Sequence, residues 1–358
     1  MRAVSALRTP LVTLVLALMV SIPAYSSTAL NVSIVIFDPG VPEDRSSHRD
    51  LQIFPRIREI EARILPFVLR DTLAETGEWG AVRVIPEPDV SAELLVTGEI
   101  GRSDGEMLEL KIRAVDASGV VWLDKAFAGA VNDGQYDAIA ADLRLAAAQL
   151  DDKKLDSIRE YSMLRYANRL APTVFGDYLE TQADGTVKVI RLPAKSDPNL
   201  DRTRRMRETE YVITDTVDAK FQELHADIAS IYELWRKYRR KNLEYQASNA
   251  EHAQVTKSAA PKGSFEDLKN QYDNYKWDRV TAQEQDRLAV AFSNEAGPKI
   301  EAIETRIAEL TAWVDQRYAL WHRLMAELFD VETTLQEAEA IEKELIDRIE
   351  TLPRGEIE

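Results

Sequence analysis

The 358-residue sequence contains no cysteine and only four histidines. Without cysteine the chain forms no disulfide and no thiolate metal site, so large cores or long helices must stabilise it. The histidines are His48, His225, His252 and His322, and no two of them have the spacing of a metal-binding pair. The HExxH, GxSxG, GxGxxG and phosphate-loop motifs are also absent. We therefore expect helix-surface histidines, no cofactor, no metal and no catalytic residue.

The charge of the chain is strongly one-sided. Aspartate and glutamate number 61 against 45 lysines and arginines, which gives a formal net charge of −16. Such a surface disfavours nucleic acid and anionic membranes as broad partners. The many carboxylates leave open a hydrolase that uses two of them, but that chemistry needs a pocket that shifts their pKa values, and the sequence reveals none.

Residues 1–26 have the pattern of a secretory signal peptide. Arg2 and Arg8 precede the apolar run Leu11–Val20, and Pro23 precedes the small residues around Ser26. A membrane span needs about 20 apolar residues, so this run is short for a stable anchor. The sequence predicts cleavage after Ser26, with Ala29 as the alternative. Because no cysteine can be lipidated, we expect a periplasmic protein without a lipid anchor.

Residues 27–132 have the pattern of a mixed-sheet α/β domain. A β-rich run precedes an amphipathic helix, and strands that alternate in polarity follow, joined by Ser103-Asp104-Gly105 and Asp116-Ala117-Ser118-Gly119. The order β-α-β-β-β-β with two hairpins predicts a mixed sheet covered by a helix. The expected elements are strands 30–37, 81–85, 94–100, 108–115 and 120–128, and a helix over 57–76.

Residues 133–197 are expected to form a helical connector. The segment 136–150 is amphipathic, and a second apolar run over 155–179 is broken at Pro172. A short β-hairpin is predicted around Asp184-Gly185, with 186–192 as its clearest strand.

From residue 198 onward the apolar residues recur every 3.5 positions. The repeat runs from Val217 to Tyr245 and again from Ile300 to Ile349. A period of 3.5 held this long favours coiled-coil packing, and two stretches of similar length favour an antiparallel hairpin. The interval 247–297 is predicted to be a capped tip that contains a flexible break over 247–263. The fold class is therefore α+β, a mixed-sheet domain followed by a long helical hairpin.

Two groups of residues are candidates for partner binding. The basic cluster contains Arg236, Lys237, Arg239 and Arg240, and the predicted tip carries the aromatic residues Tyr272, Tyr275 and Trp277. The helical register places Trp235, Tyr238 and Trp321 in the seam, and the arginines away from it. The basic cluster could contact an anionic partner or membrane surface, or it could pair within the hairpin with Glu337, Glu339, Glu342 and Glu344.

The amino-terminal module resembles the α/β domains of bacterial envelope-assembly proteins, namely the TolB amino-terminal domain and the curli-secretion lipoprotein type. The matching stretches are LNVSIVIF, LRDTLAETGEWGAVRVIP and AELLVTGEIGRSDGEMLELKIRAVDASGVVW. They cover about 100 residues, without the lipidation cysteine of the lipoproteins and without a following propeller repeat. The resemblance implies a non-enzymatic role in envelope assembly and supplies no catalytic residues.

These observations predict an exported, non-catalytic adaptor or scaffold in envelope assembly, secretion or transport. Its expected partners are envelope proteins and no nucleic acid; a peripheral membrane contact and a homo-oligomer stay open. The alternative is a periplasmic or secreted hydrolase that uses carboxylates of the α/β domain.

Overall fold

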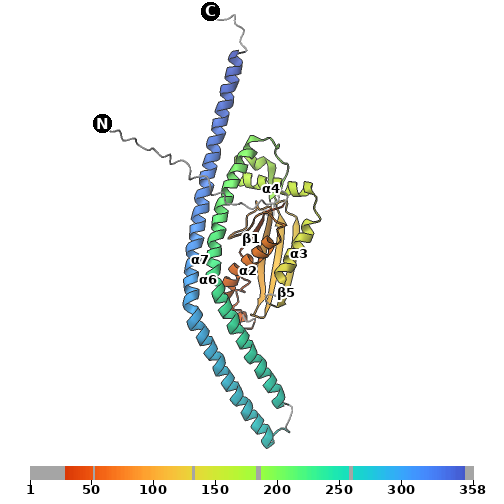
Figure 1. The fold of residues 1–358 in the computed structure, drawn as a ribbon, viewed down its shortest axis with the longest axis vertical. Helices are drawn as coiled ribbons and strands as arrows, with labels where there is room; N and C mark the ends of the chain where they lie inside the picture. Colours follow the sequence, from red (N-terminus) through yellow and green to blue (C-terminus); the bar gives the residue numbers. More distant parts are fainter. Residues whose placement is uncertain (1–28, 51–52, 131–133, 183–186, 258–260, 351–358) are drawn as a thin grey trace, which may run out of the picture.

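A computed structural model describes residues 29–50, 53–130, 134–182, 187–257 and 261–350. The predicted signal peptide, residues 1–26, lies outside these ranges. Within them, no helix combines the length and the apolar character needed to cross a membrane. The molecule is elongated, with two long helices running side by side along an α/β domain (Figure 1).

The α/β domain is built on a five-stranded sheet in the order β2-β1-β3-β4-β5. Strand β1 is parallel to β2 and β3, whereas β3, β4 and β5 are joined as antiparallel hairpins. The mixed sheet predicted from the sequence is therefore confirmed. The strands are β1 (Val32–Val35), β2 (Val82–Ile85), β3 (Leu94–Ser103), β4 (Met107–Asp116) and β5 (Val121–Ala130).

One face of the sheet is apolar and covered, and the other is charged. In β4 the alternating residues Leu108, Leu110, Ile112 and Ala114 are all buried, as a half-buried strand requires. On the opposite face Lys111 forms an ion pair of 2.7 Å with Glu99 of β3. Helix α2 (Pro55–Glu75) contacts β1, β2 and β3, helix α3 (Gln135–Ala147) contacts β5, and the long helix α6 (Pro198–Lys257) contacts β2.

Short elements complete this part of the chain. Helix α1 precedes α2, and the connector holds, besides α3, two further helices, a 3-10 turn and a small two-stranded sheet. They are α1 (Arg45–Asp50), α4 (Asp152–Leu170), α5 (Pro172–Phe175), η1 (Gly176–Tyr178), β6 (Leu179–Thr181) and β7 (Val187–Val189). Pro172 begins α5, which agrees with the predicted break. The predicted turn Asp184-Gly185 lies outside the described residues.

The remainder of the chain is an antiparallel hairpin of two helices, α6 (Pro198–Lys257) and α7 (Phe265–Glu350). They contain 60 and 86 residues, or about 90 and 130 Å at 1.5 Å per residue. The expected break over 247–263 and the separate tip over 247–297 are wrong in detail. Helix α6 continues to Lys257 and α7 begins directly after Ser264, whose hydroxyl accepts a hydrogen bond from the Asp267 amide at 3.1 Å. Pro298 lies inside α7.

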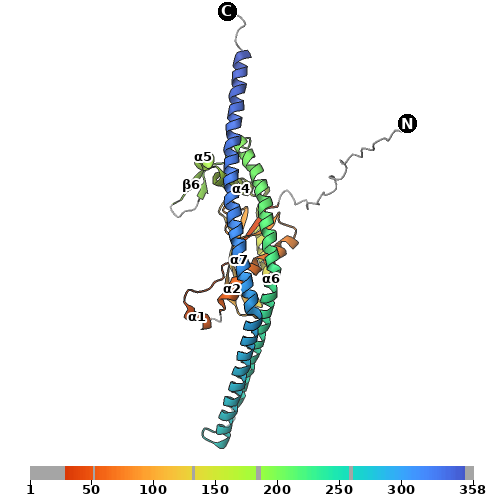
Figure 2. The same cartoon turned by 90° about the vertical axis from the view of Figure 1, so that its left-hand side faces the viewer.

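The hairpin is docked along the α/β domain. Leu224, Ile228 and Ile231 of α6 belong to the same hydrophobic core as α2 and the sheet, and so do Ala296 and Ile300 of α7. Helix α6 therefore lies between α2 and α7 over its middle third. The tip projects beyond one end of the domain, and the last turns of α7 project beyond the other (Figure 2).

Trp235 shows how the 3.5-residue repeat serves this docking. It is fully buried and contacts Phe54, which precedes α2, with an edge-on ring geometry at 6.4 Å. Tyr238 instead stacks on Phe292 of α7 at 5.0 Å. The seam positions of α6 thus alternate between two neighbours, the α/β domain and α7, rather than facing one partner helix.

Candidate interaction surfaces

The tip of α7 carries an apolar stripe on its outer face. Phe265, Leu268, Tyr272 and Tyr275 follow one another at intervals of three and four residues, so they lie on one face of the helix. All four are exposed, and the relative solvent accessibility is 63% for Tyr272 and 62% for Tyr275. We name these four residues the tip stripe. The structure thus places two of the predicted partner-binding residues, Tyr272 and Tyr275, on one accessible face.

The inner face of the same helix segment is polar. Its less exposed positions are occupied by Asn270, Asn274 and Thr281. Trp277 continues the register of these inner positions: its indole nitrogen donates to the Asn249 side chain of α6 at 2.8 Å, and its ring stacks on His252 at 4.7 Å. Apart from Trp277, the usual amphipathic pattern is therefore reversed at the tip, with polar side chains toward α6 and the tip stripe toward solvent.

The basic cluster divides into exposed and buried members. Lys237 and Arg240 are exposed and Arg236 is half-buried, with its guanidinium 5.9 Å from the Tyr232 ring centre. Arg239 was predicted to face a partner, and this is wrong, since it is only 3% exposed. Its Nε donates to the Asp104 carbonyl at 3.0 Å and its guanidinium lies 5.5 Å from the Phe54 ring centre.

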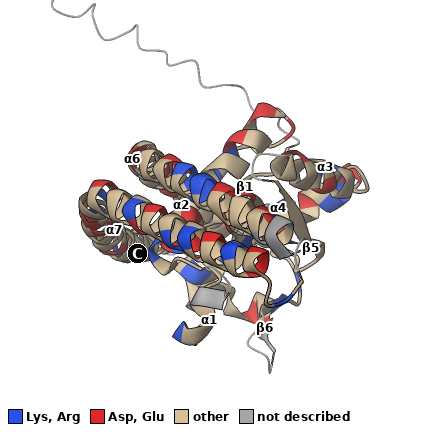
Figure 3. Cartoon of the chain, turned by 90° about the horizontal axis from the view of Figure 1, so that it is seen from below, with Lys and Arg blue, Asp and Glu red and all other residues tan. Residues whose placement is uncertain are grey.

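The predicted pairing of the basic cluster with Glu337, Glu339, Glu342 and Glu344 involves side chains that lie outside those the structure describes. Tyr238, inside the cluster, lies opposite Phe292, whereas Glu332 is paired with Arg202 near the start of α6, at 3.1 Å. The segment after Glu332 is thus at the opposite end of the hairpin from the cluster. The coloured ribbons of Figure 3 show acidic and basic residues mixed along both helices.

The burial of Arg239 predicts different effects for two neighbouring substitutions. Arg239→Ala removes a hydrogen bond to a backbone carbonyl and a cation over Phe54, so we expect it to lower the free energy of unfolding by about 1–3 kcal/mol. Arg240→Ala, at an exposed position, should stay within about 0.5 kcal/mol of the wild type. Urea unfolding of the two single variants measures both values, and equal effects would contradict the placement of Arg239.

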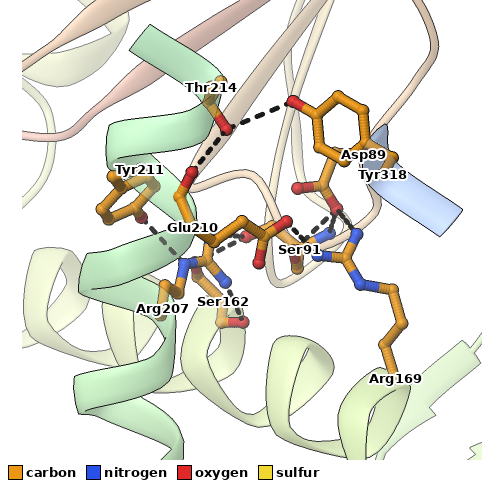
Figure 4. Close-up of polar contacts among 9 residues, drawn as sticks. All are labelled: Asp89, Ser91, Ser162, Arg169, Arg207, Glu210, Tyr211, Thr214 and Tyr318. Atoms are coloured by element: carbon orange, nitrogen blue, oxygen red, sulfur yellow. Dashed lines mark hydrogen bonds and ion pairs between the residues drawn. The ribbon is translucent and has the colours of Figure 1, made fainter. Parts of the chain in front are cut away.

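A buried polar network fixes the first turns of α6 to the α/β domain and to α4 (Figure 4). Arg207 is its centre and is 4% exposed. Its guanidinium donates to the carbonyls of Ser91 and Ser162 at 2.7 and 3.2 Å, and to the Tyr211 hydroxyl at 2.8 Å. One side chain therefore joins the loop before β3, helix α4 and helix α6.

Arg169 of α4 joins two carboxylates in the same network. It donates to Asp89 at 3.0 Å and to Oε1 of Glu210 at 2.9 Å. Burial opposes ionisation of Asp89, but Arg169, Arg207 and two hydrogen bonds from Ser91 outweigh it, so the pKa of Asp89 is lowered. Asp89 therefore stays charged at neutral pH, and its contacts hold the junction in one geometry.

A second buried polar group lies on α2. Glu61 is completely buried and accepts a hydrogen bond of 2.5 Å from the Ser103 hydroxyl. Burial raises its pKa to about 7, although the Ser103 bond and Arg58 favour the charged form. Tyr232 of α6 adjoins it and its own pKa is raised, first by burial and then by the Glu61 charge. Glu61 thus lies where α6 docks on α2.

Neither polar group was predicted from the sequence, although both leave a signal in it. Glu61 is four residues from Ile57 and four from Leu65, both buried, so it shares their helix face. Stepping back from Val217 in the same 3.5-residue register gives Thr214, Glu210 and Arg207. Polar residues at positions that continue an apolar repeat indicate a buried network rather than the end of the packing.

Comparisons with known proteins give limited information. No family model and no curated protein matches the sequence. Among solved structures, the chain is similar to a dodecameric PelC variant from Paraburkholderia phytofirmans. The two share 16% identity with a TM-score of 0.20, over 33% of this chain and 85% of that one. A similarity of this size carries no argument about function, and the resemblance to TolB and curli-secretion domains stays a prediction.

Proposed function

We propose that the chain is an exported, non-catalytic scaffold of the cell envelope that holds a partner protein at the tip of its helical hairpin. The tip stripe is the observation that carries this proposal. Four large apolar side chains at Phe265, Leu268, Tyr272 and Tyr275 face solvent, while the inner face holds polar residues and Trp277. Exposed aromatic clusters on soluble surfaces are typical of protein-binding sites, where tyrosine is enriched in hot spots.

The charges around the tip stripe favour a protein over a membrane as its partner. Over residues 265–276, Glu266, Asp267 and Asp273 stand beside Lys269 and Lys276. A helix that lies on an anionic membrane needs an excess of lysine and arginine on its polar face, which this segment lacks. A nearly neutral aromatic face on a chain of net charge −16 suits an apolar protein surface flanked by charges of both signs.

The architecture supports a scaffold because it separates the tip from the α/β domain. Helix α6 is anchored to the domain by its shared core and by the Arg207 network, so the tip is presented at a fixed distance. The hydrolase alternative has less support. The pKa of Glu61, raised to about 7, would suit acid–base catalysis. However, Glu61 is fully buried at the α2–α6 contact, which keeps substrates away from it.

The test is site-specific photo-crosslinking of the full chain in the envelope of a producing bacterium. A photoreactive phenylalanine at Tyr272 should capture a defined protein, and Tyr275→Ser with Leu268→Ser should abolish the capture. Because both side chains are exposed, the double variant should keep the wild-type melting temperature. The matched control places the same photoreactive residue at Leu145, which is exposed on α3, with 59% exposure.

Each outcome of this experiment decides for or against the proposal. A partner captured from Tyr272 and not from Leu145, and lost in the double variant, supports it; self-crosslinks would make that partner a second copy of the chain. The same captured proteins at both positions would contradict it. Sedimentation with phosphatidylglycerol vesicles that the double variant abolishes would show a membrane contact instead of a protein site.

A further inference from the structure

A second exposed apolar stripe lies on α7, at the opposite end of the hairpin from the tip stripe. Leu320, Leu324, Leu328 and Val331 follow one another at intervals of four, four and three residues, so they share one face of the helix. Their relative solvent accessibilities are 46, 47, 42 and 55%. We name these four residues the distal stripe. Large apolar side chains gathered on one exposed face indicate a surface that another molecule covers.

The apolar surface extends onto α6. Arg205 of α6 is paired with Glu332 of α7 at 3.2 Å, and Leu328 precedes Glu332 by one turn. Val212 follows Arg205 by two turns, so it shares the helix face of Arg205, and it is 64% exposed. A helix laid against the distal stripe therefore finds apolar contacts on both helices of the hairpin.

The distal stripe is exposed because the buried face of α7 departs from the 3.5-residue repeat. Val314, a position of the repeat, is buried. Further along α7 the buried residue is Phe329, which packs against α4 and α5 and lies one residue beyond the repeat position Leu328. A helix with 3.6 residues per turn drifts by about 20° per seven residues from a 3.5-residue repeat. Leu324, Leu328 and Val331 keep the repeat and are therefore left outside the contacts within the chain.

The same repeat continues in the sequence beyond the reach of α6. After Val331 its positions are 335, 338, 342, 345 and 349, all apolar except the glutamate at 342. Arg202 donates to the Thr333 hydroxyl, so Pro198, where α6 begins, is level with about residue 337 in the antiparallel hairpin. Helix α7 continues to Glu350, about 20 Å further, and its last turns project beyond the domain (Figure 2). An isolated helix of this length is only marginally stable in water, which favours a partner helix.

We propose that the distal stripe binds a second copy of this chain, with the two α7 helices packed as an antiparallel pair about a two-fold axis. A 3.5-residue repeat fits a helix with the same repeat, and two-fold symmetry lets one surface serve both copies. Four of every seven positions face the partner, so residues 320–350 contribute about 18 residues a side, slightly fewer than the roughly 20–30 of a standard interface. We therefore expect a dissociation constant of about 1–100 μM. This surface is distinct from the tip stripe and does not rest on the scaffold function.

The charges of α7 favour the antiparallel orientation. Residues 336–350 contain six acids and two bases, a net charge of −4, whereas residues 320–335 contain three acids and one base, a net charge of −2. A parallel pair places the two segments of −4 side by side. An antiparallel pair places each against a segment of −2 and brings the positions of Glu327 and Arg348 within one turn of each other. It also puts the two α/β domains at opposite ends, which reduces the repulsion between chains of net charge −16.

The dimer is tested by sedimentation equilibrium of the full chain across the expected range of dissociation constants. The mean mass of the wild type should rise with concentration from one chain to two. Leu324→Glu with Leu328→Glu should weaken the dimer at least about tenfold and, because both positions are exposed, keep the melting temperature of the monomer. Leu268→Glu, the same change in the tip stripe at 60% exposure, is the matched control and should dimerise like the wild type. A wild type that stays monomeric, or a dimer that only Leu268→Glu disrupts, would overturn the proposal.

The orientation is tested by distances between spin labels, one on each copy, because the chain has no cysteine of its own. Thr334→Cys and Arg323→Cys introduce single labelling sites at exposed positions. With the two-fold axis between residues 336 and 337, the two copies of position 334 are offset by about 8 Å along the helices and those of position 323 by about 40 Å. The helix separation adds about 10 Å across the pair. A short distance at 334 and a long one at 323 supports the antiparallel pair. Short distances at both positions, or none between copies, would overturn it.

Discussion

Replacing Glu61 by glutamine should remove a pH dependence from the stability of this protein. The pKa of Glu61 is raised from 4.5 to about 7 by burial. A carboxyl with a raised pKa contributes its stability in full below pH 4.5, where it is protonated in both states. That stability is lost as the pH rises to about 7, because the unfolded chain then releases this proton while the folded protein still retains it. The shift corresponds to about 3 kcal/mol.

The measurement is the free energy of unfolding of both proteins in urea at pH 5 and pH 8. Relative to wild type, Glu61→Gln should become more stable by up to about 3 kcal/mol between the two values. Glutamine at position 61 still accepts the hydrogen bond from Ser103. The stability of the variant should therefore change little with pH through this site. Glu59→Gln, exposed on the same helix and paired with Arg63, should show no such difference. A constant difference between wild type and Glu61→Gln would contradict the buried placement.

The α/β domain could be predicted from the sequence because its signals are local. Alternation over β4 and turn residues at Gly105 and Gly119, both with positive φ, define hairpins within a few residues of each other. The parallel pairing of β1 with β2 and β3 follows from the helical crossover. Each of these elements depends on its own residues and near neighbours, and the expected order was confirmed.

The docking of the hairpin could not be predicted in the same way. A 3.5-residue repeat says that a helix face is buried but not by which element. For Trp235 the neighbour is Phe54 of the α/β domain, and for Tyr238 it is Phe292 of α7. Arg239, one position beyond Tyr238, is buried because Gly105 at the β3–β4 turn lets it approach: a Cβ on Gly105 would lie 2.7 Å from the Cβ of Arg239. That contact joins residues far apart in the sequence.

The candidate sites also differ in whether a local sequence pattern predicts them. The tip aromatics could be found because an exposed stripe is a local pattern, and Tyr272 and Tyr275 are indeed exposed. The Arg207 network, in contrast, depends on Glu210, Asp89 and Arg169, which come from three separate segments. No spacing in the sequence relates these residues, so only the packed structure brings their charges together.

Arg207→Ala should be among the most destabilising single changes in the chain, lowering the free energy of unfolding by about 3–5 kcal/mol. Without the guanidinium, the carbonyls of Ser91 and Ser162 each lose one hydrogen bond, although the Ser91 carbonyl keeps the bond from the Ser162 hydroxyl. Asp89 also loses one of the two cations that keep it ionised. Arg207→Lys should recover only part of this loss, because one ammonium group cannot reach three acceptors in the fixed geometry of a guanidinium.

The control for Arg207 is Arg204, one turn earlier on α6. Arg204 is exposed and pairs with Asp201 on the same helix at 2.5 Å, an arrangement that contributes less than about 0.5 kcal/mol. Urea unfolding of Arg204→Ala should therefore give a value close to wild type. Similar losses for both variants would mean that helix propensity, and not the network, determines the effect. A large loss for Arg207→Ala alone would show that this side chain locks the hairpin to the α/β domain, which the scaffold function requires.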